Sequence, residues 1–168
     1  YNVEQDELRP ALIRGKDFPR NIQSLATDQK NLYIGMKDEV GCYSFATSDY
    51  QVISHPEFFY ISTLMLDSSE STLWIGNAHH LHRMNLNTKE IERVRDFYVV
   101  KSIAKDDNNL LIGTDNGLYV CDRQGTWHLI SHDARNSQSL SSNVVNMFFK
   151  DANGNIWIGT DNGISLAA

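Results

Sequence analysis

The sequence predicts an all-β protein built from repeated antiparallel sheets, and three observations support this expectation. A short apolar phrase that ends in glycine recurs at Gly35, Gly76, Gly113 and Gly159, at intervals of 41, 37 and 46 residues. Each repeat contains short apolar or β-branched runs separated by Asp, Asn and Gly. No segment shows the 3.6-residue apolar period of a helix. Four short strands in a repeat of roughly 40 residues are typical of a β-propeller blade.

The last repeat shows the expected elements most clearly. Residues 144–149 are β-branched and aromatic and predict a first strand, which ends at the turn sequence 151–154. Residues 156–158 predict a second strand, and the Asn-Gly pair at 162–163 predicts a hairpin into a third strand. The second strands are apolar at consecutive positions, which indicates burial on both faces, as expected for a blade between two neighbours.

The other repeats predict the same order of strands. We expect one domain, a partial propeller over residues 1–168, and a β-sandwich with a chance repeat is the alternative. The predicted blades cover about residues 21–54, 60–95, 99–131 and 144–168, and the fourth blade lacks its outer strand. Residues 8–18 are predicted to be the outer strand of a preceding blade.

Composition excludes some classes of partner. Hydrophobic residues make up 41% and charged residues 21% of the chain, an ordinary balance for a globular domain. The net charge of −6 gives no basic surface for nucleic acid. No apolar run reaches the roughly 18 residues that a membrane span needs, so we expect no membrane segment in this chain.

The fourth repeat carries a recognisable pattern. Residues 139–145 have the sequence SLSSNVV, and residues 151–163 have the sequence DANGNIWIGTDNG. This resembles the two-component regulator propeller repeat, in which a Trp-Ile-Gly-Thr strand follows an acidic turn. The third repeat keeps Ile112–Thr114 but has Leu111 in place of Trp, and the first two repeats depart further. The resemblance covers about residues 20–168.

The resemblance implies the sensor region of a hybrid two-component system of gut Bacteroidetes. Such a region implies a propeller, usually of seven blades, in the periplasm, with an oligosaccharide as its ligand. Histidine kinase activity would reside elsewhere in the full-length protein. Four blades are about half of such a ring, so we expect a piece of a longer protein. Its exposed blade faces would be covered by the remaining propeller blades or by a second copy of the chain.

Functional residues are expected in the loops where the repeats differ. The loop between the second and third strands and the loop between blades emerge at the same end of a propeller, where rigid strands position them. The candidate ligand-binding residues at that end are Tyr60, His79, His80, Tyr98, Asp115, Asn116, Arg135, Asn136, Asn143, Asp161 and Asn162. Packing of the aromatic rings, and a solvated loop around Arg135, are the competing structural interpretations.

We expect no catalytic residue, no metal site and no cofactor. The run from His79 to His82 invites a metal interpretation, but it has no nearby cysteine or carboxylate pair in sequence. His80 aligns with Gly117 and Gly163, which predicts a turn position where His tolerates positive φ. Asp151 is expected to bind the backbone amides of its turn, and Asp28, Asp67 and Asp106 to do the same.

Three classes of function stay open from the sequence. The first is a ligand-sensing propeller region, which the resemblance favours. The second is a glycan hydrolase or lyase on a propeller scaffold, which needs a convergent set of acid, base or nucleophile that does not stand out here. The third is a protein-interaction scaffold.

Overall fold

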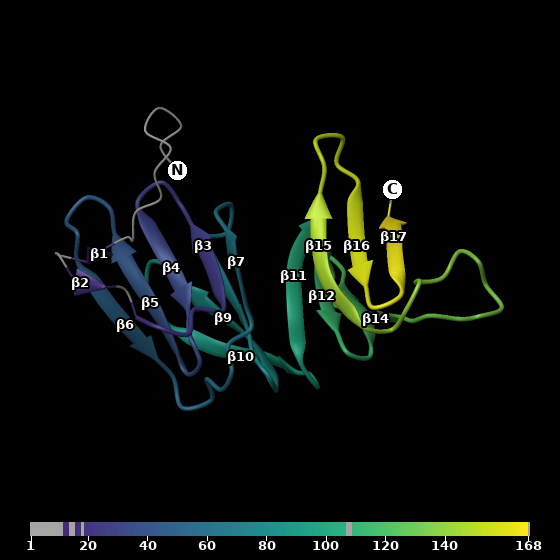
Figure 1. The fold of residues 1–168 in the computed structure, drawn as a ribbon, viewed down its shortest axis with the longest axis horizontal. Helices are drawn as coiled ribbons and strands as arrows, with labels where there is room; N and C mark the ends of the chain where they lie inside the picture. The colour runs from purple at the N-terminus through teal and green to yellow at the C-terminus, as the bar shows by residue number, and fades with distance from the viewer. Residues whose placement is uncertain (1–11, 14–15, 18, 107–108, 168) are drawn as a thin grey trace.

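The structure is a computed structural model that describes residues 12–13, 16–17, 19–106 and 109–167. All the secondary-structure elements assigned to these residues are strands. Most of them lie in four successive antiparallel sheets, and each of these sheets is a blade (Figure 1). This confirms the predicted all-β propeller section. Among the described residues, no helix has the length and hydrophobicity needed to cross a bilayer.

The first three blades have four strands each, and each strand pairs with the next one along the chain. Blade 1 contains β3 (Ser24–Thr27), β4 (Asn31–Gly35), β5 (Glu39–Ser44) and β6 (Tyr50–Ser54). Blade 2 contains β7 (Thr63–Asp67), β8 (Thr72–Gly76), β9 (His80–Asn85) and β10 (Ile91–Asp96). Blade 3 contains β11 (Val100–Asp106), β12 (Asn109–Thr114), β13 (Gly117–Cys121) and β14 (Trp127–Ile130).

Blade 4 has three strands within the described residues, namely β15 (Val145–Lys150), β16 (Ile156–Thr160) and β17 (Gly163–Ala167). Near the N-terminus, β1 (Leu12–Ile13) and β2 (Lys16–Asp17) form an antiparallel pair. The predicted outer strand at residues 8–18 falls mostly outside the described residues, so it stays a prediction.

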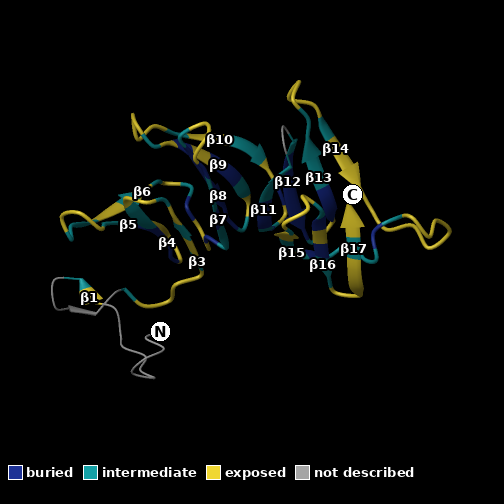
Figure 2. Cartoon of the chain, turned by 90° about the horizontal axis from the view of Figure 1, so that it is seen from above, coloured by how far each residue is buried: buried dark blue, intermediate teal, exposed yellow. Residues whose placement is uncertain are grey.

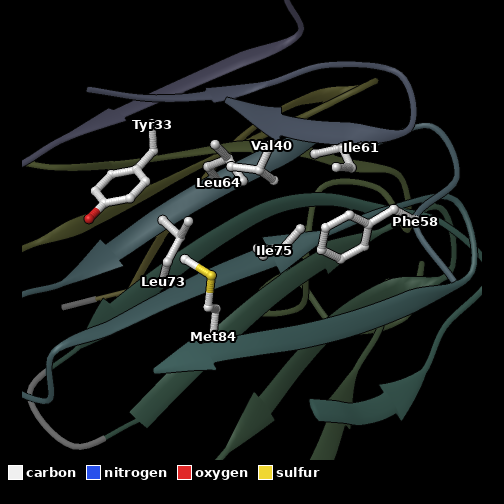
Figure 3. Packing of buried hydrophobic residues seen from close by; sticks show 8 residues of the cluster. All are labelled: Tyr33, Val40, Phe58, Ile61, Leu64, Leu73, Ile75 and Met84. Atoms are coloured by element: carbon white, nitrogen blue, oxygen red, sulfur yellow. The ribbon is translucent and has the colours of Figure 1, made fainter. Parts of the chain in front are cut away.

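The blades stack face to face, and the core lies between them. The first strands β3, β7, β11 and β15 contact one another in succession. Each of the three junctions between neighbouring blades holds one hydrophobic cluster. Figure 3 shows the first cluster, in which Tyr33 and Val40 of blade 1 face Leu73, Ile75 and Met84 of blade 2. The consecutive apolar positions of the second strands are therefore explained by burial on both faces of the sheet.

The repeated glycine lets the next blade approach closely. A Cβ atom at Gly35 would lie 3.1 Å from Cγ2 of Ile61, and one at Gly113 would lie 2.7 Å from Cγ1 of Val145. At Gly76 the corresponding neighbour is Val100. In each of these three cases the neighbour belongs to the start of the following blade. The glycine of the repeated sequence therefore lies at a contact between blades.

Blade 4 carries an uncovered apolar face. The residue opposite the repeated glycine in the third strand is Val40, Leu81, Leu118 or Ile164 in the four blades. The first three side chains are at most 3% exposed, whereas Ile164 is 70% exposed. Figure 2 shows the exposed colour along β17. We call the surface formed by Met147, Phe149, Trp157, Ile164 and Leu166 the open face.

The acidic turns are held by their own carboxylates, as expected. Oδ1 of Asp28 accepts hydrogen bonds from the amides of Lys30 and Asn31 at 2.7 and 2.6 Å. Asp67 accepts the amides of Ser69 and Glu70 in the same way. The described contact of Asp106 is an ion pair with Lys150, since part of its turn lies outside the described residues.

Asp151 accepts four hydrogen bonds from its own turn and the strand that follows. Its carboxylate accepts the backbone amides of Asn153 and Asn155, the side-chain amide of Asn155, and the indole N–H of Trp157 at 3.0 Å. These bonds, the one from Trp157 above all, lower the pKa of Asp151 from its ordinary 3.8 to about 2. The turn therefore favours the ionised carboxylate.

This lowered pKa predicts a contribution to stability that acid removes. A carboxylate whose folded pKa lies below its unfolded pKa stabilises the fold above about pH 4, and the effect is lost as pH falls toward 2. We expect Asp151→Asn to lower the melting temperature at pH 7, with a difference from wild type that shrinks between pH 4 and 2. Thermal melts across that range measure it. A difference that stays constant with pH would contradict the assignment.

Candidate functional site

The loops at one end of the blades are joined into a continuous surface. We call it the loop face, and it comprises residues 36–38, 55–62, 77–79, 97–99, 115–116, 131–144 and 161–162. The amide of Ile61 donates to the carbonyl of Lys37, and the amide of Ala78 donates to that of Phe59. Farther along the chain, the amide of Gly117 donates to the carbonyl of Asn143. Each inter-blade loop thus lies beside a hairpin loop, as expected for a propeller.

Aromatic rings gather on the part of the loop face formed by blades 1 and 2. The rings of Phe59 and His79 stack with centroids 5.6 Å apart and planes 3° from parallel, and Tyr60 meets Phe59 edge-on at 4.7 Å. The amide of Phe97 donates to the carbonyl of His79, which brings the loop of Tyr98 alongside. Phe59, Tyr60 and Tyr98 are 45%, 54% and 78% exposed. We call Phe59, Tyr60, His79 and Tyr98 the aromatic patch.

The conformation of Tyr60 is unusual. Its φ is +50°, which is uncommon for a non-glycine residue and costs free energy that the surrounding contacts must offset. The ammonium group of Lys37 lies 5.1 Å from the centre of the Tyr60 ring, a cation–π contact that fixes the ring beside Phe59. A strained and exposed aromatic residue on a rigid scaffold is a reasonable ligand contact.

The histidine segment follows a different local structure from the one expected. Oδ1 of Asn77 accepts hydrogen bonds from the amides of His79 and His80 at 2.8 and 2.7 Å, which closes the turn. His80 is not among the residues with positive φ, so the expectation drawn from Gly117 and Gly163 was wrong. Because Oδ1 of Asn77 binds these two backbone amides, the turn closes without a residue of positive φ at position 80. His80 instead begins β9, and its Nδ1 lies 3.1 Å from Oδ1 of Asp96.

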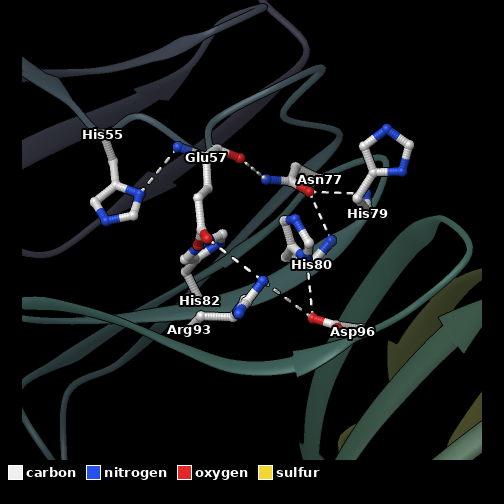
Figure 4. A network of polar contacts seen from close by, with 8 residues as sticks. All are labelled: His55, Glu57, Asn77, His79, His80, His82, Arg93 and Asp96. Atoms are coloured by element: carbon white, nitrogen blue, oxygen red, sulfur yellow. Dashed lines mark hydrogen bonds and ion pairs between the residues drawn. The ribbon is translucent and has the colours of Figure 1, made fainter.

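His82 lies buried behind this turn, between blades 1 and 2 (Figure 4). Its Nε2 is 3.1 Å from Oε2 of Glu57, a residue of the loop that joins the two blades. Burial lowers the pKa of His82, although the hydrogen bond to Glu57 opposes that shift. The same hydrogen bond holds the pKa of Glu57 below its usual range. The expected pair at neutral pH is therefore a neutral imidazole beside an ionised carboxylate.

A second group of polar residues lies between blades 3 and 4. Lys101 Nζ lies 2.6 Å from Oδ1 of Asp115 and donates to Oδ1 of Asn146 at 3.0 Å. The side-chain amide of Asn146 in turn donates to Asp161 at 2.6 Å. Asp115 and Asp161 are thus linked through two residues that the sequence interpretation had not selected. Their neighbours Asn116 and Asn162 donate backbone amides to Thr114 and Thr160, which closes the two hairpins.

The long insertion before blade 4 encloses a cleft of about 570 Å³. Asn136, Gln138 and Ser139 line one side, and Ile164 and Leu166 line the other. Asn143 lies at the base of the insertion, where its side-chain oxygen accepts the amide of His132 at 2.6 Å. Arg135 is exposed and is not part of the lining.

Six of the eleven predicted site residues therefore fall into three groups on the loop face. Tyr60, His79 and Tyr98 belong to the aromatic patch, Asp115 and Asp161 to the polar network, and Asn136 to the cleft. Sequence reasoning did not select Glu57, His55 and Arg93 beside His82. Arg93 lies beside His82 because β9 pairs with β10, whereas His55 and Glu57 reach His82 from the loop that joins the two blades.

The arrangement defines a section of a β-propeller whose variable loops gather at one end. Residues 139–162 match the family described as two component regulator propeller. The match confirms the resemblance seen in the sequence, and the chain contains a two-component regulator propeller repeat. Among curated proteins, none matches the chain.

Solved structures agree with this family. The extracellular domain of a hybrid two-component system of B. thetaiotaomicron shares 33% identity over 99% of this chain, with a TM-score of 0.84. The extracellular domain of a second hybrid system of that organism shares 27% identity over 83% of the chain, with a TM-score of 0.68. The chain covers 24% and 19% of those two domains. It therefore spans about a quarter of these relatives or less.

A designed protein shows how little the fold depends on the details of sequence. The computationally designed Ika4 protein aligns with 96% of this chain over 97% of its own length, with a TM-score of 0.66. Its sequence identity to this chain is 15%, so the likeness concerns the fold alone.

Proposed function

We propose that this chain is part of the extracytoplasmic, ligand-sensing propeller of a hybrid two-component sensor histidine kinase. The family match and the extracellular domains that resemble the chain support a sensor propeller region. The proposal places the propeller in the periplasm and the kinase elsewhere in the protein. Binding would act by favouring one of two arrangements of the propeller and the domains that follow it.

We further propose that the ligand is an oligosaccharide, and the aromatic patch carries this proposal. Sugar rings present flat C–H surfaces that pack on exposed aromatic rings, and Tyr adds a hydroxyl that forms hydrogen bonds. Phe59 and His79 are already stacked, and Tyr60 is held in place by Lys37. Little side-chain freedom is then lost on binding, which favours affinity. The negative net charge favours a neutral sugar over a strongly anionic one.

We propose no catalytic role for this section. Its solved relatives are extracellular domains of signalling systems, which supports binding without turnover. We also propose that the open face is covered by another blade of the ring. At the three junctions within this chain, the equivalent face is covered by strands of the following blade.

Binding of a panel of oligosaccharides from plant and host glycans tests the ligand proposal. We expect the purified protein to bind at least one of them and leave it unhydrolysed, and Tyr60→Ala or Tyr98→Ala to weaken binding about tenfold, which corresponds to about 1.4 kcal/mol. Isothermal titration calorimetry measures the affinity. Phe45→Ala is the matched control, because Phe45 is 50% exposed but follows β5 at the opposite end of blade 1. Hydrolysis of the oligosaccharide would favour the enzyme alternative, and equal loss in the control would contradict the assigned surface.

A further inference from the structure

Three potential metal ligands meet at the junction of blades 1 and 2. His55 and Glu57 come from the loop between the blades, and His82 comes from β9. One ligand atom of each side chain lies within 4.8 Å of the ligand atoms of the other two. Figure 4 shows the three side chains grouped around the Glu57 carboxylate. This group could not be predicted from the sequence, because Glu57 and His82 are far apart in the chain.

We propose that His55, Glu57 and His82 bind a divalent transition metal ion, with zinc as the best match. Two imidazoles and one carboxylate are a donor set that suits zinc, with a fourth position left for water. Calcium and magnesium prefer sites made of oxygen ligands alone and fit this set poorly. The inference is independent of the proposed oligosaccharide.

The separation of two of the three ligand atoms is close to what such an ion requires. Nε2 of His82 and Oε2 of Glu57 are 3.1 Å apart. Two ligands of one tetrahedral zinc ion, each about 2.0–2.1 Å from the metal, are separated by about 3.3 Å. The His55 ring lies beside this pair, with its centre 5.2 Å from that of His82. Its contact with the amide of Glu57 is long, at 3.3 Å, so the ring can turn toward the ion without losing a strong hydrogen bond.

A histidine is not needed at position 82 for the fold. His82 pairs with Ile75 of the second strand, and the residues at the same register in the other blades are Gly41, Tyr119 and Ser165. The ring of His82 is fully buried, and its Nδ1 has no hydrogen-bond partner. A fully buried imidazole at a position where the other blades have glycine, tyrosine or serine is not required by the packing that the blades share.

Arg93 is the main opposing charge. Its guanidinium lies 3.4 Å from Oε1 of Glu57 and also contacts Asp96 at 3.6 Å. A bound cation would compete with Arg93 for the Glu57 carboxylate. The proposal therefore predicts that removing the Arg93 charge strengthens metal binding, whereas a purely structural network would gain nothing from its removal.

Titration of chelator-treated purified protein with zinc tests the site. We expect one zinc ion per chain by calorimetry and, with cobalt(II), the visible absorption of a tetrahedral site. His55→Ala and Glu57→Gln should each weaken binding at least tenfold, and Arg93→Ala should strengthen it. His79→Ala and His128→Ala are matched controls, since both residues are exposed histidines outside the group and should leave the affinity unchanged.

Two outcomes would overturn the proposal. One is the absence of saturable binding at micromolar zinc in wild-type protein with a native circular dichroism spectrum. The other is binding that survives both His55→Ala and Glu57→Gln but is lost in His79→Ala, which would place the ion at the exposed histidines. Because the test uses the metal alone, its failure leaves the oligosaccharide proposal intact.

Discussion

Leu81→Ala is expected to destabilise the protein by about 2–5 kcal/mol, the range for truncating a fully buried leucine. Leu81 is 0% exposed and belongs to the hydrophobic cluster between blades 2 and 3, which also contains Val100 and Ile112. The alanine would leave a cavity that two packed sheets cannot close. Denaturant unfolding measures the loss. In a protein of this size each kcal/mol lowers the melting temperature by about 2–4 °C.

Ile164→Ala is the matched control at the equivalent position of blade 4. Because Ile164 is 70% exposed on the open face, its truncation should change stability by no more than about 0.5 kcal/mol in this chain. In a longer protein with a further blade on that face, the cost should rise toward that of Leu81→Ala. A cost below about 1 kcal/mol for Leu81→Ala would contradict the inter-blade core. An equal cost at Ile164 in this chain would show that a second copy covers the open face, and light scattering would then report a dimer.

Gly76→Ala is expected to cost about 1–3 kcal/mol through overpacking. The added Cβ would lie 2.7 Å from Cγ2 of Thr63 and 2.9 Å from Cβ of Val100. Both neighbours are β-branched and have little freedom to move within a strand. The methyl group would push blade 3 away from blade 2, and urea unfolding would report the lost stability.

Gly159→Ala provides the comparison for this second prediction. The three atoms nearest to an added Cβ there all belong to Met147, with side-chain atoms at 2.8 and 3.5 Å and the backbone oxygen at 3.8 Å. Met is flexible and can move aside, so we expect a change within about 0.5 kcal/mol. Equal losses for the two variants would mean that the glycine serves the conformation of its own strand and not the approach of the next blade.

Most of the fold could be predicted from the sequence because its determinants are local. The Asp and Asn turns and the apolar second strands specify each blade within about 40 residues. Their recurrence along the chain indicates how many blades there are. The start of the first strand was predicted less well. The predicted second blade begins at about residue 60, but its first strand β7 begins at Thr63, because the amide of Ile61 donates to the carbonyl of Lys37 in the preceding blade. A contact between blades thus sets a boundary that strand propensity cannot predict.

The candidate site could be predicted only in part, for a related reason. The sequence indicates which loops vary between the repeats, so Tyr60, His79 and Tyr98 could be predicted as candidate ligand-binding residues. It does not indicate that Glu57 meets His82, because that contact forms only when blade 2 packs on blade 1. His80 shows the same limit, since alignment with glycine suggested positive φ, whereas the side chain of Asn77 closes the turn by another means.

The repeated residues hold the blades together, and we propose that the loop face binds the ligand. Calorimetric titration of an oligosaccharide bound by wild-type protein, repeated with Tyr60→Ala and Gly76→Ala, tests it most directly when combined with thermal melts. We predict that Tyr60→Ala loses about tenfold in affinity with an unchanged melting temperature, and that Gly76→Ala melts earlier but, while folded, binds as wild type does. Full affinity in Tyr60→Ala and Tyr98→Ala together would contradict the claim.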